Sequence, residues 1–264
     1  MLPLFLLADS RLPSGSHGHS GGVEALVDRG LVRTAEDLAL FLQGRVRTGG
    51  RVVAAAAAAA CVLADGSRGW QQGGVAVTGR EQGHPAATPA EPGRALEHPA
   101  PGDRAPVDWA PWDAAVSART PSAALRVASR AQGAALLRTV SLAFPTPAVT
   151  ALRALPRVHH PLVLGAAAAA AGGDPAQAAA LALHHLVGGA ATAAVRLLGL
   201  DPLRVTAVTA AVARSAEPVA ADAATLGSAA VAAGDPALLP TEGSVLTDVL
   251  AELHRASEAT LFAS

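Results

Sequence analysis

The sequence predicts an all-α fold, and three observations lead to that prediction. Proline repeatedly follows a residue that caps helix N-termini, at Thr120-Pro121, Asp174-Pro175, Asp201-Pro202 and Asp235-Pro236. Tyrosine is absent, and no stretch alternates apolar and polar residues convincingly enough to predict a strand. Hydrophobic residues make up 51% of the chain, and much of that share is alanine, the strongest helix former. We therefore expect a compact helical bundle, with residues 1–264 as a single domain that one insert interrupts.

The opening stretch, residues 7–27 (LADSRLPSGSHGHSGGVEALV), is the densest in specific residue choices. Its four glycines (Gly15, Gly18, Gly21 and Gly22) favour a loop whose backbone adopts conformations that other residues reach poorly. Serines supply side-chain oxygens before a helix, and Glu24 is placed to complement the helix dipole. We expect a shaped loop that ends in a helix from Val23.

The next helices follow from their caps and from their periodicity. Thr34 and Asp37 form a capping pair, and apolar residues then recur at helical spacing from Leu38. The alanine-rich run Val52–Ala64 also predicts a helix. Because alanine buries little area, such a helix is best stabilised when it is surrounded, in the centre of a bundle or at a subunit interface.

Later elements are predicted in the same way. Gly188-Gly189 interrupts the helical pattern that starts at Pro175, so we expect a kink or a split into two helices there. Near the C-terminus, Leu246, Val249, Leu250 and Leu253 form one apolar stripe on a late helix.

Between about residues 66 and 108 the composition changes sharply. Prolines and glycines recur, and the apolar content falls. A segment of this kind cannot bury enough apolar area to offset its ordering entropy. We expect a long, disordered Pro/Gly-rich insert that is dispensable for folding.

Charge and cysteine content exclude several classes of protein. The formal net charge is -1, with twenty arginines and no lysine, so no global field draws the chain to nucleic acid or to a membrane surface. The longest apolar run, Val52–Ala64, is shorter than the roughly 20 residues that a membrane span needs. The N-terminus lacks the basic start of a signal peptide, and the single cysteine, Cys61, suits a reducing compartment. We expect a cytoplasmic protein with no membrane partner.

Candidate chemistry is limited to histidines. His17 and His19 could ligate a transition metal, which would make the chain a metal-dependent hydrolase, or they could be polar loop residues held by the neighbouring serines. Adjacent helical residues point about 100° apart, so two neighbouring histidines on a helix cannot bind one metal ion together. We therefore predict that the pairs His159-His160 and His184-His185 are a helix cap and a half-buried polar face. No Ser-His-Asp order, phosphate loop or dinucleotide motif is present, so we predict no catalytic residue and no cofactor.

Four stretches together resemble one known family. The first is Leu7-Ala8-Asp9-Ser10 with Leu12-Pro13, His19-Ser20 and Gly22-Val23-Glu24, and the second is Ser129-Arg130-x-x-Gly133-x-x-Leu136-Leu137. The third is Ala193-Ala194-Val195-Arg196-Leu197, and the fourth is His254 with Leu261-Phe262-x-Ser264. This set is similar to the urease accessory protein UreF family over the whole chain except the insert.

The resemblance implies a function. UreF proteins are all-α and commonly dimeric, and they bind UreD (also called UreH). With the GTPase UreG they deliver nickel to the urease apoprotein, and they are not enzymes themselves. Carried over motif by motif, the resemblance implies a partner-binding role for His19, Glu24, Arg130, Arg196, His254, Leu261 and Phe262.

Departures from the family pattern concern mostly the tail. Arg255 stands where the family has glutamate, and Thr260 and Ala263 stand where it often has arginine. Leu198-Gly199-Leu200-Asp201 replaces the family's P-L-G-Q. Partner contacts that depend on those tail charges are therefore not expected here.

Overall fold

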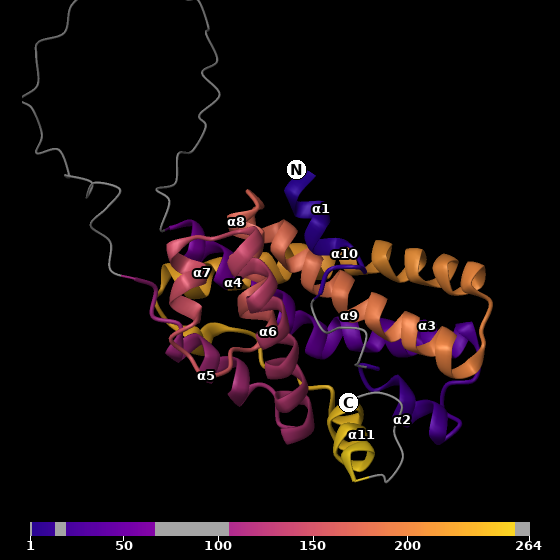
Figure 1. Cartoon of the computed structure of the whole chain (residues 1–264). Helices are drawn as coiled ribbons and strands as arrows, with labels where there is room; N and C mark the ends of the chain where they lie inside the picture. Colours follow the sequence, from indigo (N-terminus) through magenta and orange to yellow (C-terminus); the bar gives the residue numbers. More distant parts are fainter. Residues whose placement is uncertain (1, 14–19, 67–105, 257–264) are drawn as a thin grey trace, which may run out of the picture.

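The computed structural model describes residues 2–13, 20–66 and 106–256, and every regular element within these ranges is a helix (Figure 1). The all-α prediction is therefore confirmed. Most of the insert and the tail after Ala256 lie outside these ranges, so the expectations for them stay predictions. In chain order the elements are α1 (Leu2–Ala8), α2 (Val23–Asp28), α3 (Ala35–Arg45), η2 (Val46–Gly50), α4 (Arg51–Asp65), α5 (Ala110–Ala118), α6 (Ala123–Ala143), α7 (Pro147–Leu152), α8 (His160–Ala170), α9 (Pro175–Leu198), α10 (Pro202–Ala232), η3 (Pro236–Leu238) and α11 (Val245–Arg255).

The alanine-rich helix α4 lies at the centre of the bundle, and α8, α9 and α10 pack around it (Figure 1). Every side chain from Ala54 to Cys61 is buried. The neighbouring helices approach so closely that a Cβ on Gly165 of α8 would overlap the carbonyl oxygen of Ala57. A Cβ on Gly227 of α10 would likewise overlap the carbonyl oxygen of Ala55. Small residues thus allow backbone-to-backbone contact on two sides of α4, as its composition predicts.

Local capping signals mostly place the helix starts correctly. Thr34 and Asp37 form a capping box, Asp174 caps α9, and Asp201 caps α10. Asp235 caps the short turn η3. The start predicted at Thr120-Pro121 is wrong, because the side chain of Ser122 caps α6.

The cap at Ser122 is completed by a distant helix. Its hydroxyl accepts a hydrogen bond from the N–H of Leu125 at 3.2 Å and donates to Glu252 of α11 at 2.7 Å. The same carboxylate accepts the N–H of Ala124 at 2.8 Å. Helix α11 therefore fixes where α6 begins, which local sequence cannot show.

Of the kink or split expected at Gly188-Gly189, the split is also wrong, since α9 runs unbroken from Pro175 to Leu198. An irregular turn is found instead at η2, between α3 and α4, where Thr48 has φ -112° and ψ -108°. A glycine inside a helix costs only about 1 kcal/mol, which the packing of α9 against α4 and α10 can offset.

The apolar stripe predicted near the C-terminus lies on α11, and only part of it is buried. Leu250 is buried, whereas Leu246, Val249 and Leu253 remain about half exposed. The helix packs on α2 and α6 through its buried side.

Two helical segments have the length and hydropathy of membrane spans, Ala35–Asp65 and Pro175–Leu198. Within each segment, more than half of the most apolar 18-residue window is buried inside the bundle, at 61% and 56%. Core helices of a bundle have the same character, and α4 and α9 are core helices here.

Candidate functional site

Motifs from the two ends of the chain meet in a buried contact. Glu24 in the first turn of α2 and His254 in the last turn of α11 lie with Oε2 and Nε2 3.3 Å apart. Both side chains are almost completely buried, at 5% and 4% exposure. They are thus parts of the fold, and any influence that they have on a partner acts through the position of α2 and α11.

The opening loop is anchored around the same two helices. Gly22 precedes α2 with φ +89°, a conformation that favours glycine, and a Cβ there would lie 3.3 Å from the Thr247 methyl group of α11. The N–H of Gly22 donates to the Ser20 hydroxyl at 3.3 Å. Arg45 at the end of α3 donates to the carbonyl oxygen of Gly21. His17 and His19 lie outside the described residues, so their roles stay predictions.

Arg130 holds the linker between α7 and α8 against α6. Its Nη2 donates to Asp113 Oδ2 at 2.7 Å and to the Ser117 hydroxyl at 2.9 Å, both on α5. Its Nη1 donates to the carbonyl oxygen of Arg157. One guanidinium therefore joins α5, α6 and the linker, and the predicted partner role of Arg130 stays untested.

His159 completes this network from the linker side. Its ring is fully buried, with Nε2 2.9 Å from the Ser117 hydroxyl and Nδ1 3.0 Å from the Ser129 hydroxyl. The backbone N–H of His159 donates to Asp113 Oδ1 at 3.0 Å. A Cβ on Gly133 would overlap the carbonyl oxygen of Val158, so only glycine fits here. The Ser129-Arg130-x-x-Gly133 motif is thus an internal lock that fixes the linker on α6.

Burial decides the charge state of this histidine. Desolvation lowers the pKa of His159 to about 4, helped by the positive charges of Arg130 and Arg126 and opposed by the carboxylate of Asp113. The ring is therefore neutral near pH 7, with one nitrogen donating and the other accepting between the two serines.

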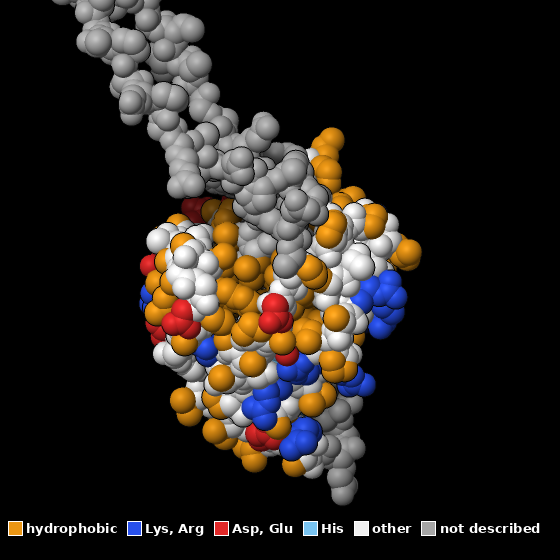
Figure 2. All heavy atoms as spheres, turned by 90° about the vertical axis from the view of Figure 1, so that its left-hand side faces the viewer, with side chains coloured by type: hydrophobic (Ala, Val, Ile, Leu, Met, Phe, Trp, Pro, Cys, Tyr) orange, Lys and Arg blue, Asp and Glu red, His pale blue; other side chains and the backbone are white. Residues whose placement is uncertain are grey.

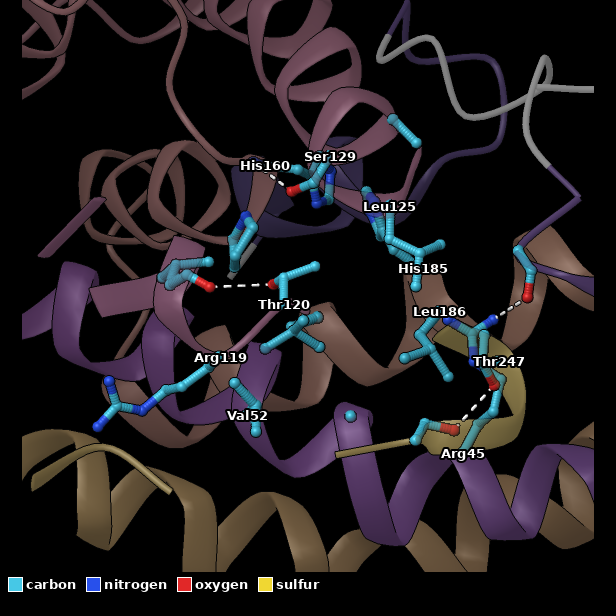
Figure 3. Close-up of a pocket in the computed structure, with 18 of the residues that line it drawn as sticks. Arg45, Val52, Arg119, Thr120, Leu125, Ser129, His160, His185, Leu186 and Thr247 are labelled. Atoms are coloured by element: carbon cyan, nitrogen blue, oxygen red, sulfur yellow. Dashed lines mark hydrogen bonds between the residues drawn. The ribbon is translucent and has the colours of Figure 1, made fainter. Parts of the chain in front are cut away.

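A cavity of about 190 Å³ lies next to the lock (Figure 3). The rings of His160 and His185 line it with centroids 5.4 Å apart. Arg45 and Asp248 line it as well, and burial lowers the pKa of Arg45 to about 10 while it raises the pKa of Asp248. The cavity has room for several waters or one small polar molecule.

The histidine pair on α9 has a structural role. His185 Nε2 lies 2.7 Å from the carbonyl oxygen of Leu7, and His184 Nε2 lies 3.2 Å from that of Ala8. The pair therefore satisfies carbonyl groups at the C-terminus of α1. Within the described residues, no three His, Cys, Asp or Glu side chains come together as metal ligands.

Of the remaining predicted partner residues, Arg196 is the one that the structure describes, and it lies exposed in the last turn of α9. Leu261 and Phe262 lie outside the described residues. Cys61 is buried in α4, and burial raises the pKa of its thiol to about 12, so it is a small core residue as predicted.

Comparison with known proteins decides the family. A family model described as UreF matches residues 32–213. "Urease accessory protein UreF" of Mycobacterium sp. (strain JLS) is 38% identical over 263 residues, which cover 99% of this chain and 97% of that protein. Proteins of the same name from Mycolicibacterium vanbaalenii and Mycobacterium marinum are 37% and 35% identical over 261 residues, with the same two coverages. The chain belongs to the UreF family.

Membership in the UreF family makes this chain a urease accessory protein and not an enzyme. The alternative of a metal-dependent hydrolase is therefore set aside. In this UreF-family protein the quoted motifs have two kinds of role. The middle motif fixes the α7–α8 linker on α6, and Glu24 and His254 join α2 to α11.

Sequence reasoning missed three members of the lock, Asp113, Ser117 and His159. Asp113 follows Trp112 just where the chain returns from the insert, which is the one local signal that could have drawn attention to it. His159 was expected as a helix cap and does occupy the cap position of α8, but its side chain makes no capping bond. Its real partners come from α5 and α6.

Proposed function

We propose that this protein is a non-catalytic scaffold of urease maturation. With UreD (UreH) and the GTPase UreG it enables nickel insertion into the urease apoprotein. The observation that carries the proposal is the similarity to urease accessory proteins over 99% of the chain. Nickel is cargo in this proposal, and none of the described residues is assigned to hold it.

The proposed scaffold works in the cytoplasm as a homodimer, without nucleic acid or membrane as a partner. A net charge of -1 and the single cysteine support this setting. The C-terminal tail, with Leu261 and Phe262, is proposed to bind UreD, because an apolar pair in a polar chain end gains stability when a partner groove buries it.

The test is co-purification. The tagged chain, co-expressed with UreD and UreG, should elute with both proteins and with two copies of itself per complex. A variant with Arg33→Glu, an exposed change on the loop before α3, serves as a control that should assemble normally. A folded chain that binds neither UreD nor UreG would contradict the proposal.

A further inference from the structure

The charges that border the cavity differ from those on the outer surface of the molecule. On the face shown in Figure 2, arginines and carboxylates are interspersed among hydrophobic side chains. Around the cavity of about 190 Å³, by contrast, Arg45 of α3 and Asp248 of α11 both form part of the lining. Within residues 2–13, 20–66 and 106–256, Arg45 makes no ion pair with Asp248 or with any other carboxylate. Two opposite charges thus border one small space without direct contact.

The guanidinium of Arg45 is held in place by its neighbours (Figure 3). Its Nη1 donates to the carbonyl oxygen of Gly21, and its Cζ lies 5.7 Å from the centroid of the Phe41 ring. A Cβ on Gly21 would lie 2.7 Å from the same Nη1, so the absence of a side chain there makes room for the guanidinium. A guanidinium has five N–H groups, and the bond to Gly21 is the one that Arg45 donates among the described residues. The other N–H groups are available to an acceptor in the cavity.

Hydrogen-bond acceptors also border the cavity. His185 Nε2 lies 2.7 Å from the carbonyl oxygen of Leu7, so Nε2 carries the proton and Nδ1 is an acceptor. Burial lowers the pKa of His185, which keeps the ring neutral near pH 7. The Asp248 carboxylate interacts with the backbone N–H of Ser122 and has further acceptor sites. The lining therefore matches a molecule that offers both an acceptor for Arg45 and N–H donors for His185 and Asp248.

The two charges decide which small molecules fit. A bound anion would be attracted by Arg45 and repelled by Asp248, and a bound cation would experience the reverse. A zwitterion would complement both charges, but its charged groups would lose their hydration beside Val52, Leu125 and Leu186, which also line the cavity. An uncharged primary amide avoids that cost, because its carbonyl oxygen accepts hydrogen bonds and its amino group donates them.

We propose that this cavity binds a small uncharged amide of the size of acetamide or urea. Arg45 binds its carbonyl oxygen, and the Asp248 carboxylate and His185 Nδ1 accept its N–H groups. Gly21, Arg45, His185 and Asp248 belong to the opening loop, α3, α9 and α11, so a bound amide links these four elements. The inference concerns a ligand site and does not depend on partner binding, so it goes beyond the proposed function.

Three isosteric probes test the charge argument. Acetamide, acetate and acetamidinium have nearly the same size and shape and differ in charge. Each is titrated into the full-length chain up to about 50 mM at constant ionic strength, and the NMR shifts of the Gly21 amide and the Arg45 Nε–H are followed. We expect saturable shifts with acetamide, and roughly tenfold weaker binding of both ions, because each ion is repelled by one of the two charges. Urea at the same concentration, which is far below denaturing levels, should give the same shifts as acetamide.

Two neighbouring glycines of α9 supply a blocking variant and its matched control. Gly189 lines the cavity, and a Cβ there meets no atom within 4 Å, so Gly189→Leu can fill the cavity without removing a polar group. Gly188 has the same free space but lies outside the cavity lining, so Gly188→Leu makes the same change elsewhere. Gly189→Leu should abolish the saturable shifts, whereas Gly188→Leu should bind acetamide as wild type does. Circular dichroism and melting temperature check that both variants are folded.

A second variant tests the charges without filling the cavity. Asp248→Asn keeps the size of the side chain and removes the charge that repels an anion. We expect this variant to bind acetate at least as tightly as acetamide, which reverses the preference of wild type.

Four outcomes would overturn the inference. Tighter binding of acetate or acetamidinium than of acetamide by wild type would mean that the site recognises an ion. No saturable shift with acetamide or urea would mean that the cavity holds water alone. Unchanged binding in Gly189→Leu, or an equal loss in Gly188→Leu, would place the amide elsewhere. Each of these results would leave assembly with UreD and UreG, and thus the proposed function, unaffected.

Discussion

At the scale of single residues, the fold depends on places where no side chain fits and on one buried neutral imidazole. Gly165, Gly227 and Gly133 each sit where a Cβ would overlap a neighbouring carbonyl oxygen. His159 sits between two serine hydroxyls with no access to solvent. The bundle therefore combines close backbone contacts with a buried polar side chain whose hydrogen bonds are satisfied.

Replacement of Gly165 by alanine tests the contact between α8 and α4. The added methyl group would collide with the carbonyl oxygen of Ala57, so we expect the free energy of unfolding to fall by about 1–3 kcal/mol. Gly188→Ala is the matched control, because a Cβ there meets no atom within 4 Å. Helix propensity predicts that this control is neutral or stabilising by about 1 kcal/mol. Urea denaturation of both variants measures the difference, and equal stabilities would refute the close contact.

The neutral state of His159 predicts an acid-dependent loss of stability. Its folded pKa of about 4 lies below the unfolded value of 6.5, so the unfolded chain binds the proton more readily. Stability should be complete above about pH 6.5 and decline as the pH falls toward 4. His159→Asn should show a shallower decline over this interval than wild type. An unchanged slope in His159→Asn would mean that the ring is not buried in neutral form.

At the scale of elements, the contacts that position helices come from residues far apart in the chain. Asp174 and Asp201 were predicted correctly as caps because a cap depends on only four neighbouring residues. The start of α6 was predicted wrongly because Glu252, 130 residues away from Ser122, helps to fix it. The split of α9 was predicted wrongly because packing outweighs two weak helix formers.

The Glu252 carboxylate, which binds the start of α6, should make the stability of the fold depend on pH. Hydrogen bonds from Ala124 and Ser122, aided by Arg255, lower its pKa to about 2, below its usual 4.5. The stability that it contributes is present above about pH 4.5 and is lost as the pH falls toward 2. We therefore expect Glu252→Gln to lower the melting temperature at pH 7 and to change it little near pH 2. Glu217→Gln, an exposed change on α10, controls for the loss of one charge. A melting temperature equal to wild type at pH 7 would contradict the cap.

At the scale of the whole molecule, the bundle brings α2 and α11 together. Glu24 and His254 are 230 positions apart and lie in one buried contact. The sequence predicted the helical class and, as one of two alternatives, the central position of α4. It could not predict that the motifs around Glu24 and His254 would meet, because periodicity and caps carry no information on pairing between distant helices. The contacts of Arg130 with α5 and with the linker could not be predicted for the same reason.

Deletion of residues 259–264 tests the division between fold and partner binding. The apolar stripe of α11 ends near Leu253, and Ser257, Glu258 and Thr260 make the chain end polar, so we expect the melting temperature to stay within a few degrees of wild type. Assembly with UreD should weaken, because Leu261 and Phe262 are removed. A truncated chain that unfolds, while its folded fraction still binds UreD normally, would assign the tail to the core.

Nickel incorporation into urease tests the central claim most directly. Urease apoprotein is co-expressed with UreD, UreG and a nickel supply, with and without this chain, and metal content and urea hydrolysis of the purified enzyme are measured. A maturation scaffold predicts nickel-loaded, active urease only when the chain is present, and no urea hydrolysis by the chain alone. Equal nickel content and activity in its absence would contradict the account.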